Sequence, residues 1–441
     1  MNLAIPTLLA ATRACAIAVL AVPAALAALR WMRGFSPLAV RFVFVATALV
    51  FFTPAMLAGY GWLPTVARWP GGSAAREIFY CSMLWIRFTP IAALALWFAN
   101  PGPTATASHC MRLAGGGSWC WRLRELGTGP WLAGGVVFLF AFQEFDLATS
   151  WGIRSWTVAL FDAQVGGLAL GDSLQLSLPA LCLDLAVIAP LLRTIHRLPP
   201  RRTNREQRNR QQSWTAVLQY AIAPALFVAL PAWFVLRLGF DGFAAWLQNL
   251  TLAREMTNSL VLAVFCASLA WLLAALARRH AAILLAAPGL LGPLLLSLLL
   301  AAAAQQVGAI GRTALPLVLA IVLQLLPLAL LLRALLSAGT DRTALHIARI
   351  SRARPVEWTL ARGPAAGAVL LLFGVAYSDF TASTLLAPPQ FTTVFVRIFN
   401  LMHYGQGAVL SATVFVAVAT PLLCLWLTRL MLRLYVARRV R

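Results

Sequence analysis

The sequence contains no lysine, so its 35 basic Lys/Arg positions are all arginine. Without lysine the chain has no Schiff-base amine and no P-loop lysine, so any ATP must be hydrolysed by a partner. Its seven cysteines show neither a CxxC pair nor a Cys/His zinc spacing. Most lie in apolar runs, as expected for reduced structural thiols. We therefore expect a chain that is not an enzyme on its own and that holds no cofactor and no metal.

Charged residues are also scarce, at 11% of the chain, whereas apolar residues make up 61% and the mean hydropathy is +0.81. This composition excludes an ordinary soluble domain and indicates a polytopic membrane protein. The net charge of +22 would suggest nucleic-acid binding in a soluble protein. Here the arginines cluster between apolar runs, where orientation in a membrane explains them better, so we expect no nucleic-acid partner.

Apolar runs predict an all-α membrane protein with about eleven transmembrane helices. They begin near Ile5, Leu38, Phe79, Pro130, Ser173, Trp214, Met256, Ala281, Thr313, Pro364 and Ala408. If the spans alternate, the arginine-rich connections all fall on one side, which the positive-inside rule makes cytoplasmic. The amino terminus is then outside and the carboxyl terminus inside. The first run is interpreted as a signal anchor, because Arg30 and Arg33 follow it and further spans come after it.

The only long polar stretch is "RTIHRLPPRRTNREQRNRQQ", whose composition predicts a flexible cytoplasmic linker. It separates a first half, residues 1–200, from a second half, residues 214–441, with the basic linker at 201–213. We expect about five transmembrane helices in the first half, which lacks a leading span, and about six in the second. Binding of the linker to anionic lipid head groups is an alternative to a merely solvated loop.

The two halves contain a predicted internal repeat. In the loops before two of the spans, "HCMRLAGGGSWCWRL" aligns without gaps on "HIARISRARPVEWTL". Each copy then enters a span that ends in an acid-Phe pair, Glu144-Phe145 in the first half and Asp379-Phe380 in the second. Because both loops are expected on the cytoplasmic side, the repeat is parallel, with a pseudo-twofold axis along the membrane normal.

Acids within apolar runs are the candidate functional residues. Glu144, Asp146 and Asp379 lie roughly 20 Å from the cytoplasmic start of their spans, at about 1.5 Å per residue. A carboxylate in hydrocarbon costs roughly 2.5 to 3.5 kcal/mol on insertion scales, so it usually faces a bundle interior or water. Two interpretations stay open: wetted residues at helix ends, or an acidic lining of a translocation path for a cationic solute. Arg87 and Asp184, each near the middle of a first-half span, predict a buried ion pair.

The stretch "DFTASTLLAPPQFTTVFVRIFNLMHYGQGAVLSA", from Asp379 to Ala412, resembles a segment of the permease subunits of binding-protein-dependent ABC importers. The likeness is to the fused two-half permeases of the iron(III) type. This resemblance implies the type I importer fold, a bacterial inner (plasma) membrane location and solute transport by alternating access. It also implies two partners, a cytoplasmic ATP-binding homodimer and an external solute-binding protein. Iron(III) or another cationic small solute is the substrate that it suggests.

The two aligned loops stand where that family carries its EAA motif, a helix-turn-helix that docks on the ATPase. Both copies depart from the motif: His109 and His346 replace its glutamates, and Arg352 replaces the second glycine. The resemblance implies these coupling residues: His109, Arg112, Gly115, Trp121, His346, Arg349 and Trp358. The departures leave two alternatives, an ion-coupled secondary transporter with the acids of the acid-Phe pairs as proton carriers, and a non-transporting membrane scaffold descended from a permease.

Overall fold

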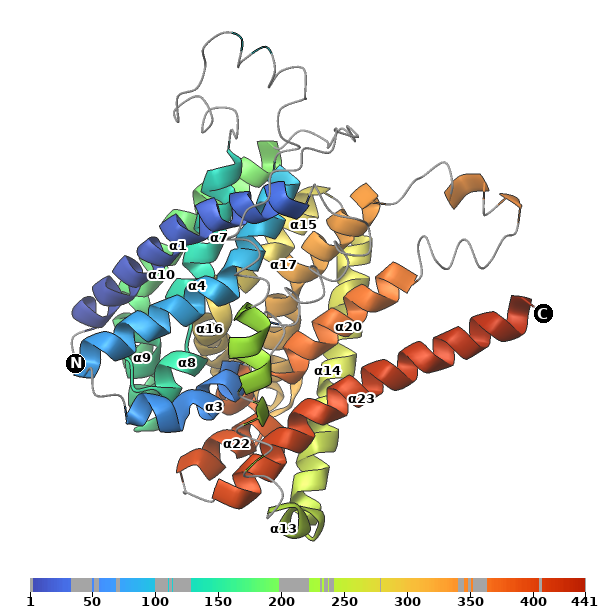
Figure 1. Ribbon diagram of the computed structural model, residues 1–441. Helices are drawn as coiled ribbons and strands as arrows, with labels where there is room; N and C mark the ends of the chain where they lie inside the picture. Colours follow the sequence, from blue (N-terminus) through green and yellow to red (C-terminus); the bar gives the residue numbers. More distant parts are fainter. Residues whose placement is uncertain are drawn as a thin grey trace. The chain divides into compact units, whose positions relative to one another are not determined.

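The computed structural model describes residues 3–32, 50, 55–68, 72–99, 110, 113, 128–197, 222–230, 232–233, 237, 242–277, 279–339, 345–347, 350–351, 363–403 and 407–440. Every regular element in these residues is a helix, which confirms the predicted all-α class for this part of the chain (Figure 1). The chain divides into two compact units, Met1–Pro231 and Ala232–Arg441. The predicted linker at 201–213 lies outside the described residues, so the predicted domain limits stay predictions.

Six of the described helices are long and apolar enough to cross a membrane, the character of a multi-pass membrane protein. They are Ala4–Leu29, Gly129–Ser150, Leu170–Arg193, Leu250–Leu276, Leu284–Gln306 and Leu315–Ala334. Shorter apolar helices, Gly363–Tyr377 and Gly407–Thr420, lie where two further spans are predicted. The predicted spans near Leu38 and Trp214 fall largely outside the described residues. The total of about eleven spans therefore stays a prediction.

The first unit is built around three helices that pack on one another, α1, α4 and α7 (Figure 1). Its described elements are α1 (Ala4–Met32), α3 (Ala55–Ala67), α4 (Gly72–Ala99), α7 (Gly129–Phe142), α8 (Asp146–Ser150), α9 (Trp156–Val165), α10 (Leu170–Arg197) and a π-helical turn, η1 (Ala225–Ala229). Helix α10 packs against α7 and α9, while α3 packs against α8 and η1.

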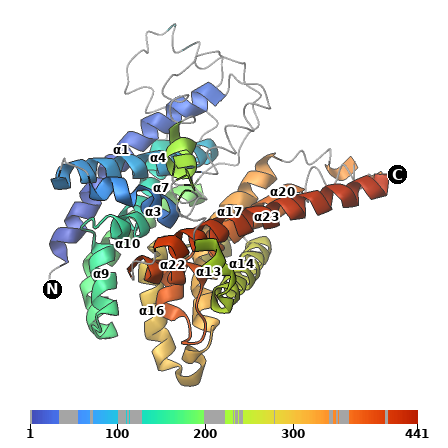
Figure 2. The same cartoon turned by 60° about the horizontal axis from the view of Figure 1, so that its bottom comes forward.

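The second unit is also built around three mutually packed helices, α14, α17 and α20. Its described elements are α13 (Phe243–Leu247), α14 (Leu250–Leu276), α15 (Arg279–Ala286), η3 (Pro288–Leu291), α16 (Gly292–Gln306), η4 (Gly308–Arg312), α17 (Leu315–Gly339), α20 (Gly363–Tyr377), α21 (Thr381–Leu386), α22 (Val394–His403) and α23 (Gly407–Val440). Helix α22 packs against α14 and α23, and α13 packs against α23 (Figure 2).

Small residues form the packed faces of the central helices. In α1 the buried face includes Ala10, Ala14, Ala18, Ala21, Ala25 and Ala28, spaced three or four residues apart. Larger apolar side chains of the same helix, such as Leu8, Val19 and Leu20, are exposed. Helix α14 repeats this arrangement, with Ala263, Ala267, Ala270 and Ala274 buried. Alanine lets neighbouring helices approach closely, and outward leucine and valine suit a lipid environment, as is typical of membrane helices.

The span predicted near Ala281 is interrupted in the structure. Helix α15 ends at Ala286, a 3-10 turn follows, and α16 begins at Gly292, whose φ of +80° favours glycine. At Gly289 the backbone of α17 comes so close that an added Cβ would lie 2.1 Å from the Leu323 carbonyl oxygen. Glycine is therefore required where this turn passes α17.

Candidate functional site

Glu144 joins two helices of the first unit. Helix α7 ends at Phe142, and a non-helical break of three residues separates it from the start of α8. The Glu144 side chain is buried, and its carboxylate accepts hydrogen bonds from the backbone N–H groups of Leu147 at 2.7 Å and Ala148 at 3.2 Å. The hydroxyl of Tyr80, on α4, donates a third bond at 2.9 Å. Because the first N–H groups of a helix lack helical partners, Glu144 acts as the cap of α8.

Helix α9 also holds this break. The indole N–H of Trp156 donates to the Phe142 carbonyl oxygen at 2.9 Å, which satisfies a group at the end of α7. The hydroxyl of Thr157 donates to the Glu144 carbonyl oxygen at 3.0 Å. The side chain and the carbonyl oxygen of Glu144 thus both accept hydrogen bonds, and these bonds fix the geometry of the break.

The second unit has a break of the same local form after α20. Asp379 follows the end of that helix, and its Oδ2 accepts bonds from the backbone N–H of Ser383 at 3.0 Å and the Ser383 hydroxyl at 3.2 Å. The next residue, Phe380, is buried and precedes α21, as buried Phe145 precedes α8. Their backbone angles are close, with φ and ψ of −110° and −45° at Phe380 and −121° and −45° at Phe145.

The predicted acidic residues therefore lie at helix ends, one of the two interpretations of the sequence. Glu144, however, is 7% exposed, so it is buried rather than wetted. Asp146 is the first residue of α8. It lies within electrostatic reach of the Arg87 guanidinium, as does Glu144. A role of Glu144, Asp146 and Asp379 in a translocation path stays a prediction.

The predicted ion pair between Arg87 and Asp184 is not formed in the described part of the chain. Both carboxylate oxygens of Asp184 are buried and have no hydrogen-bond partner there. Arg87, on α4, instead interacts with Glu144 and Asp146. The reason is the position of α10, which carries Asp184 and packs on α7 and α9. Both residues lie near the middle of their predicted spans, but the apolar pattern contains no information on which helix faces which.

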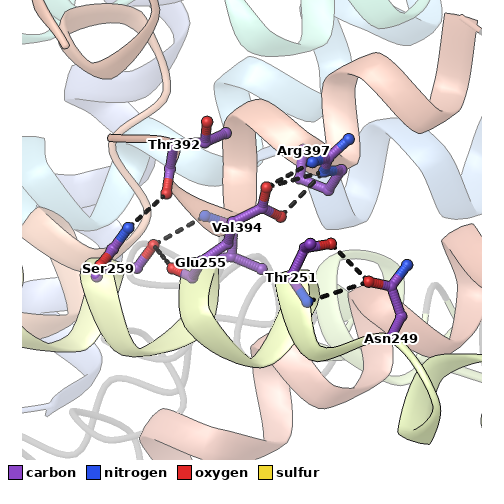
Figure 3. Close-up of polar contacts among 8 residues, drawn as sticks. Asn249, Thr251, Glu255, Ser259, Thr392, Val394 and Arg397 are labelled. Carbon is purple, nitrogen blue, oxygen red and sulfur yellow. Dashed lines mark hydrogen bonds and ion pairs between the residues drawn. The ribbon is translucent and has the colours of Figure 1, made fainter. Parts of the chain in front are cut away.

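An ion pair that sequence reasoning missed joins α14 to α22 (Figure 3). Arg397 donates to both carboxylate oxygens of buried Glu255: Nη2 to Oε1 at 2.6 Å, and Nε to Oε1 at 3.1 Å and Oε2 at 2.9 Å. These hydrogen bonds raise the pKa of Arg397. Glu255 directly precedes the span predicted near Met256, and no repeated pattern in the sequence marks it.

The same face of α14 holds the start of α22. The Ser259 hydroxyl accepts a bond from the backbone N–H of Val394, the first residue of α22, at 2.8 Å (Figure 3). The Asn258 side-chain amide donates to the Thr392 carbonyl oxygen at 3.3 Å. Together with the Glu255 ion pair, these bonds fix α22 on α14 at three points along one helix face.

The first unit has a related contact between α1 and the start of α9. Arg13, on α1, donates from Nη2 to the carbonyl oxygen of Arg154, which lies two residues before α9 begins. Thr392 likewise lies two residues before α22 begins and accepts from α14. Arg13 also lies 3.5 Å from Glu77 Oε2. In both units, a polar side chain of one central helix thus donates a hydrogen bond to the carbonyl oxygen two residues before a short helix, α9 or α22.

Most of the predicted coupling residues lie outside the described residues: His109, Arg112, Gly115, Trp121, Arg349 and Trp358. His346 is described, in a short helical turn, and is exposed. Within the described residues no group of three His, Cys, Asp or Glu side chains is placed to hold a metal ion.

Comparison of the chain with models of known protein families, with curated proteins and with solved structures finds no match. Function is therefore inferred from the residues themselves. The acid-Phe breaks and the contacts that hold α9 and α22 are the features on which such an inference can rest.

Proposed function

We propose that this chain is the membrane subunit of a binding-protein-dependent ABC importer and forms its solute path. The observation that carries the proposal is the likeness between α7, the Glu144-Phe145 break and α8 in one unit and α20, the Asp379-Phe380 break and α21 in the other. A repeated joint of this kind is expected where two related halves of a transporter line the same path. The resemblance of residues 379–412 to importer permeases points in the same direction.

In this proposal the capping acids have a double role. Their bonds to backbone N–H groups stabilise the first turn of the short helix that follows each break. As a lining of the path, these acids would favour a cationic solute such as iron(III) or another small cation. Asp146, next to the first cap, adds to the same field.

The remaining machinery would come from partners. A cytoplasmic homodimer of ATP-binding subunits would bind ATP and move the two coupling loops, and an external solute-binding protein would deliver the solute. ATP binding would favour the outward-open state, and hydrolysis would reset it, because the nucleotide has different affinities for the two states. The chain would lie in the bacterial inner (plasma) membrane, with its amino terminus outside and its carboxyl terminus inside.

The test is to purify the full-length protein from its native membrane in mild detergent, identify the co-purifying proteins and assay ATPase activity. Recovery of an ATP-binding subunit is expected, and replacing Trp121 and Trp358 by Ala should remove it. Trp131→Ala is the matched control, because Trp131 lies on α7 and is 82% exposed, away from the predicted loops. Failure to recover any ATP-binding subunit, with the wild type as with the control, would overturn the proposal.

A second candidate function, ion-coupled secondary transport, is favoured by the loss of both glutamates from the EAA-like loops. It predicts uptake driven by a proton gradient without an ATPase. Replacing Glu144 by Gln and Asp379 by Asn should then abolish uptake, whereas a non-transporting scaffold would show no uptake to lose. The caps oppose this candidate, because three donors occupy the Glu144 carboxylate and a proton carrier must exchange such partners.

A further inference from the structure

Asp184 lies near the middle of α10 on a continuous buried face. The other buried residues of this face, spaced three or four apart, are Ser173, Ser177, Ala180, Ile188 and Leu191. The face packs on α7, because a Cβ added to Gly135 would lie 2.8 Å from Leu191 Cδ2. Asp184 itself has no exposed surface, at 0%. Its carboxyl is therefore enclosed at the interface between α10 and α7, within the first unit.

In the described part of the chain, no cation or hydrogen-bond donor is bonded to the carboxyl of Asp184. Neither oxygen has a hydrogen-bond partner of normal geometry among the described residues, although the Gln143 side chain interacts with the carboxyl. The acids discussed above differ in this respect. Glu144 and Asp379 accept backbone N–H bonds, and Glu255 is paired with Arg397.

No described cation on the helices packed on α10 is hydrogen-bonded to Asp184. Helix α7 carries no titratable residue. The titratable residues of α1, α9 and the break after α7 are Arg13, Cys15, Arg30, Asp162 and Glu144. No described side chain of this set is hydrogen-bonded to Asp184, and Glu144 is occupied by its own three donors. On α10 itself, Asp172, Cys182 and Arg193 are at other positions of the helix.

We propose that Asp184 is a proton-binding site of the first unit, which holds its proton while α10 packs on α7 and releases it when that interface opens. An ionised carboxylate without a partner would carry a large desolvation penalty, and such a group becomes neutral instead. A metal ion would need several more oxygen or nitrogen ligands, whereas a proton needs only the one carboxyl. The bound proton links the packing of two apolar helices to pH.

This site is separate from the capping acids and does not depend on the proposed importer function. In any transport cycle that separates α10 from α7, water would reach Asp184 and its proton would exchange. In a protein without such a cycle, the neutral acid would simply remain at the interface. The protonation state can therefore be measured without knowing the substrate.

The test compares infrared spectra of the full-length wild type and Asp184→Asn in lipid nanodiscs at about pH 7. The difference spectrum is expected to show loss of the carbonyl band of a neutral carboxylic acid. Glu255→Gln is the matched control, since Glu255 is buried but paired, and it should lose carboxylate bands instead. Loss of carboxylate bands in Asp184→Asn would overturn the proposal. If Asp184→Asn fails to accumulate, Asp184→Ser removes the same carboxyl and gives the same two outcomes.

Thermal unfolding against pH provides a second readout. Raising the pH from about 6 to about 9 favours states in which Asp184 is exposed and ionised. The unfolding temperature of the wild type should therefore fall more than that of Asp184→Asn over this range. An equal fall in both proteins would show that Asp184 releases no proton on unfolding over this range, which would overturn the proposal.

Discussion

At the scale of single residues, the capping role of Glu144 can be tested by measuring stability, without a transport assay. Its carboxylate accepts three hydrogen bonds while it is 7% exposed. Glu144→Ala would leave two backbone N–H groups and the Tyr80 hydroxyl without partners, so we expect a loss of about 3 kcal/mol in the free energy of unfolding. Denaturant unfolding in detergent measures it. Glu77→Ala is the control, because Glu77 is 40% exposed and its pair with Arg13 is 3.5 Å long. Unchanged stability of Glu144→Ala would contradict the capping role.

The pair of Glu255 and Arg397 is a second residue-scale prediction. Arg397→Met removes the cation and leaves buried Glu255 without charge compensation, which should lower the free energy of unfolding by roughly 2 to 3 kcal/mol. This lies below the usual range for breaking buried pairs, because the Arg397 side chain is 35% exposed. Adding Glu255→Gln to Arg397→Met should restore part of the loss. A double-mutant cycle measures this coupling, and strictly additive losses would show that the pair does not hold α22 on α14.

At the scale of elements, the turn between α15 and α16 depends on one glycine. A Cβ at Gly289 would lie 2.1 Å from the Leu323 carbonyl oxygen and 2.8 Å from Pro327. Backbone atoms of α17 cannot move aside without a large cost in free energy. Gly289→Ala should therefore force the turn away from α17 and lower the free energy of unfolding by about 2 kcal/mol. Gly374→Ala, within α20, is the matched control, because nothing lies within 4 Å of its Cβ position. Thermal unfolding compares the two variants, and equal unfolding temperatures would refute the close approach.

Element positions could be predicted from apolar runs, but the contacts that stop the helices could not. The run from Pro130 predicts a span that ends in the Glu144-Phe145 pair, and α7 ends at Phe142. The stop depends on Tyr80 and on N–H groups that only the folded chain brings to Glu144. Depth along a helix likewise predicted the Arg87 and Asp184 pair, but the rotation of each helix about its axis decides the partners. Hydropathy contains no information on that rotation.

At the scale of the whole molecule, the membrane class follows directly from sequence, because bilayer thickness sets the length of an apolar run. The six long apolar helices agree with it. Contacts between segments that are distant in the sequence could not be predicted in this way. Glu255 and Arg397 are 142 residues apart, and neither is unusual in its own stretch, so no local signal joins them. The acid-Phe pairs were found from sequence only because they occur twice.

Orientation is the whole-molecule property that the arginine distribution predicts, and thiol labelling tests it. Cys110 is exposed and lies in a loop expected to be cytoplasmic. A variant that keeps Cys110 and has serine at the other six of the seven cysteines should react with a membrane-impermeant maleimide in inverted vesicles but not in right-side-out ones. The matched variant removes Cys110 and adds Val165→Cys, at an exposed position after the first acid-Phe break. It should show the reverse pattern, because one span separates the two positions. Labelling of both from the same side would mean that the chain between them does not cross the membrane an odd number of times, and the assigned orientation would fail.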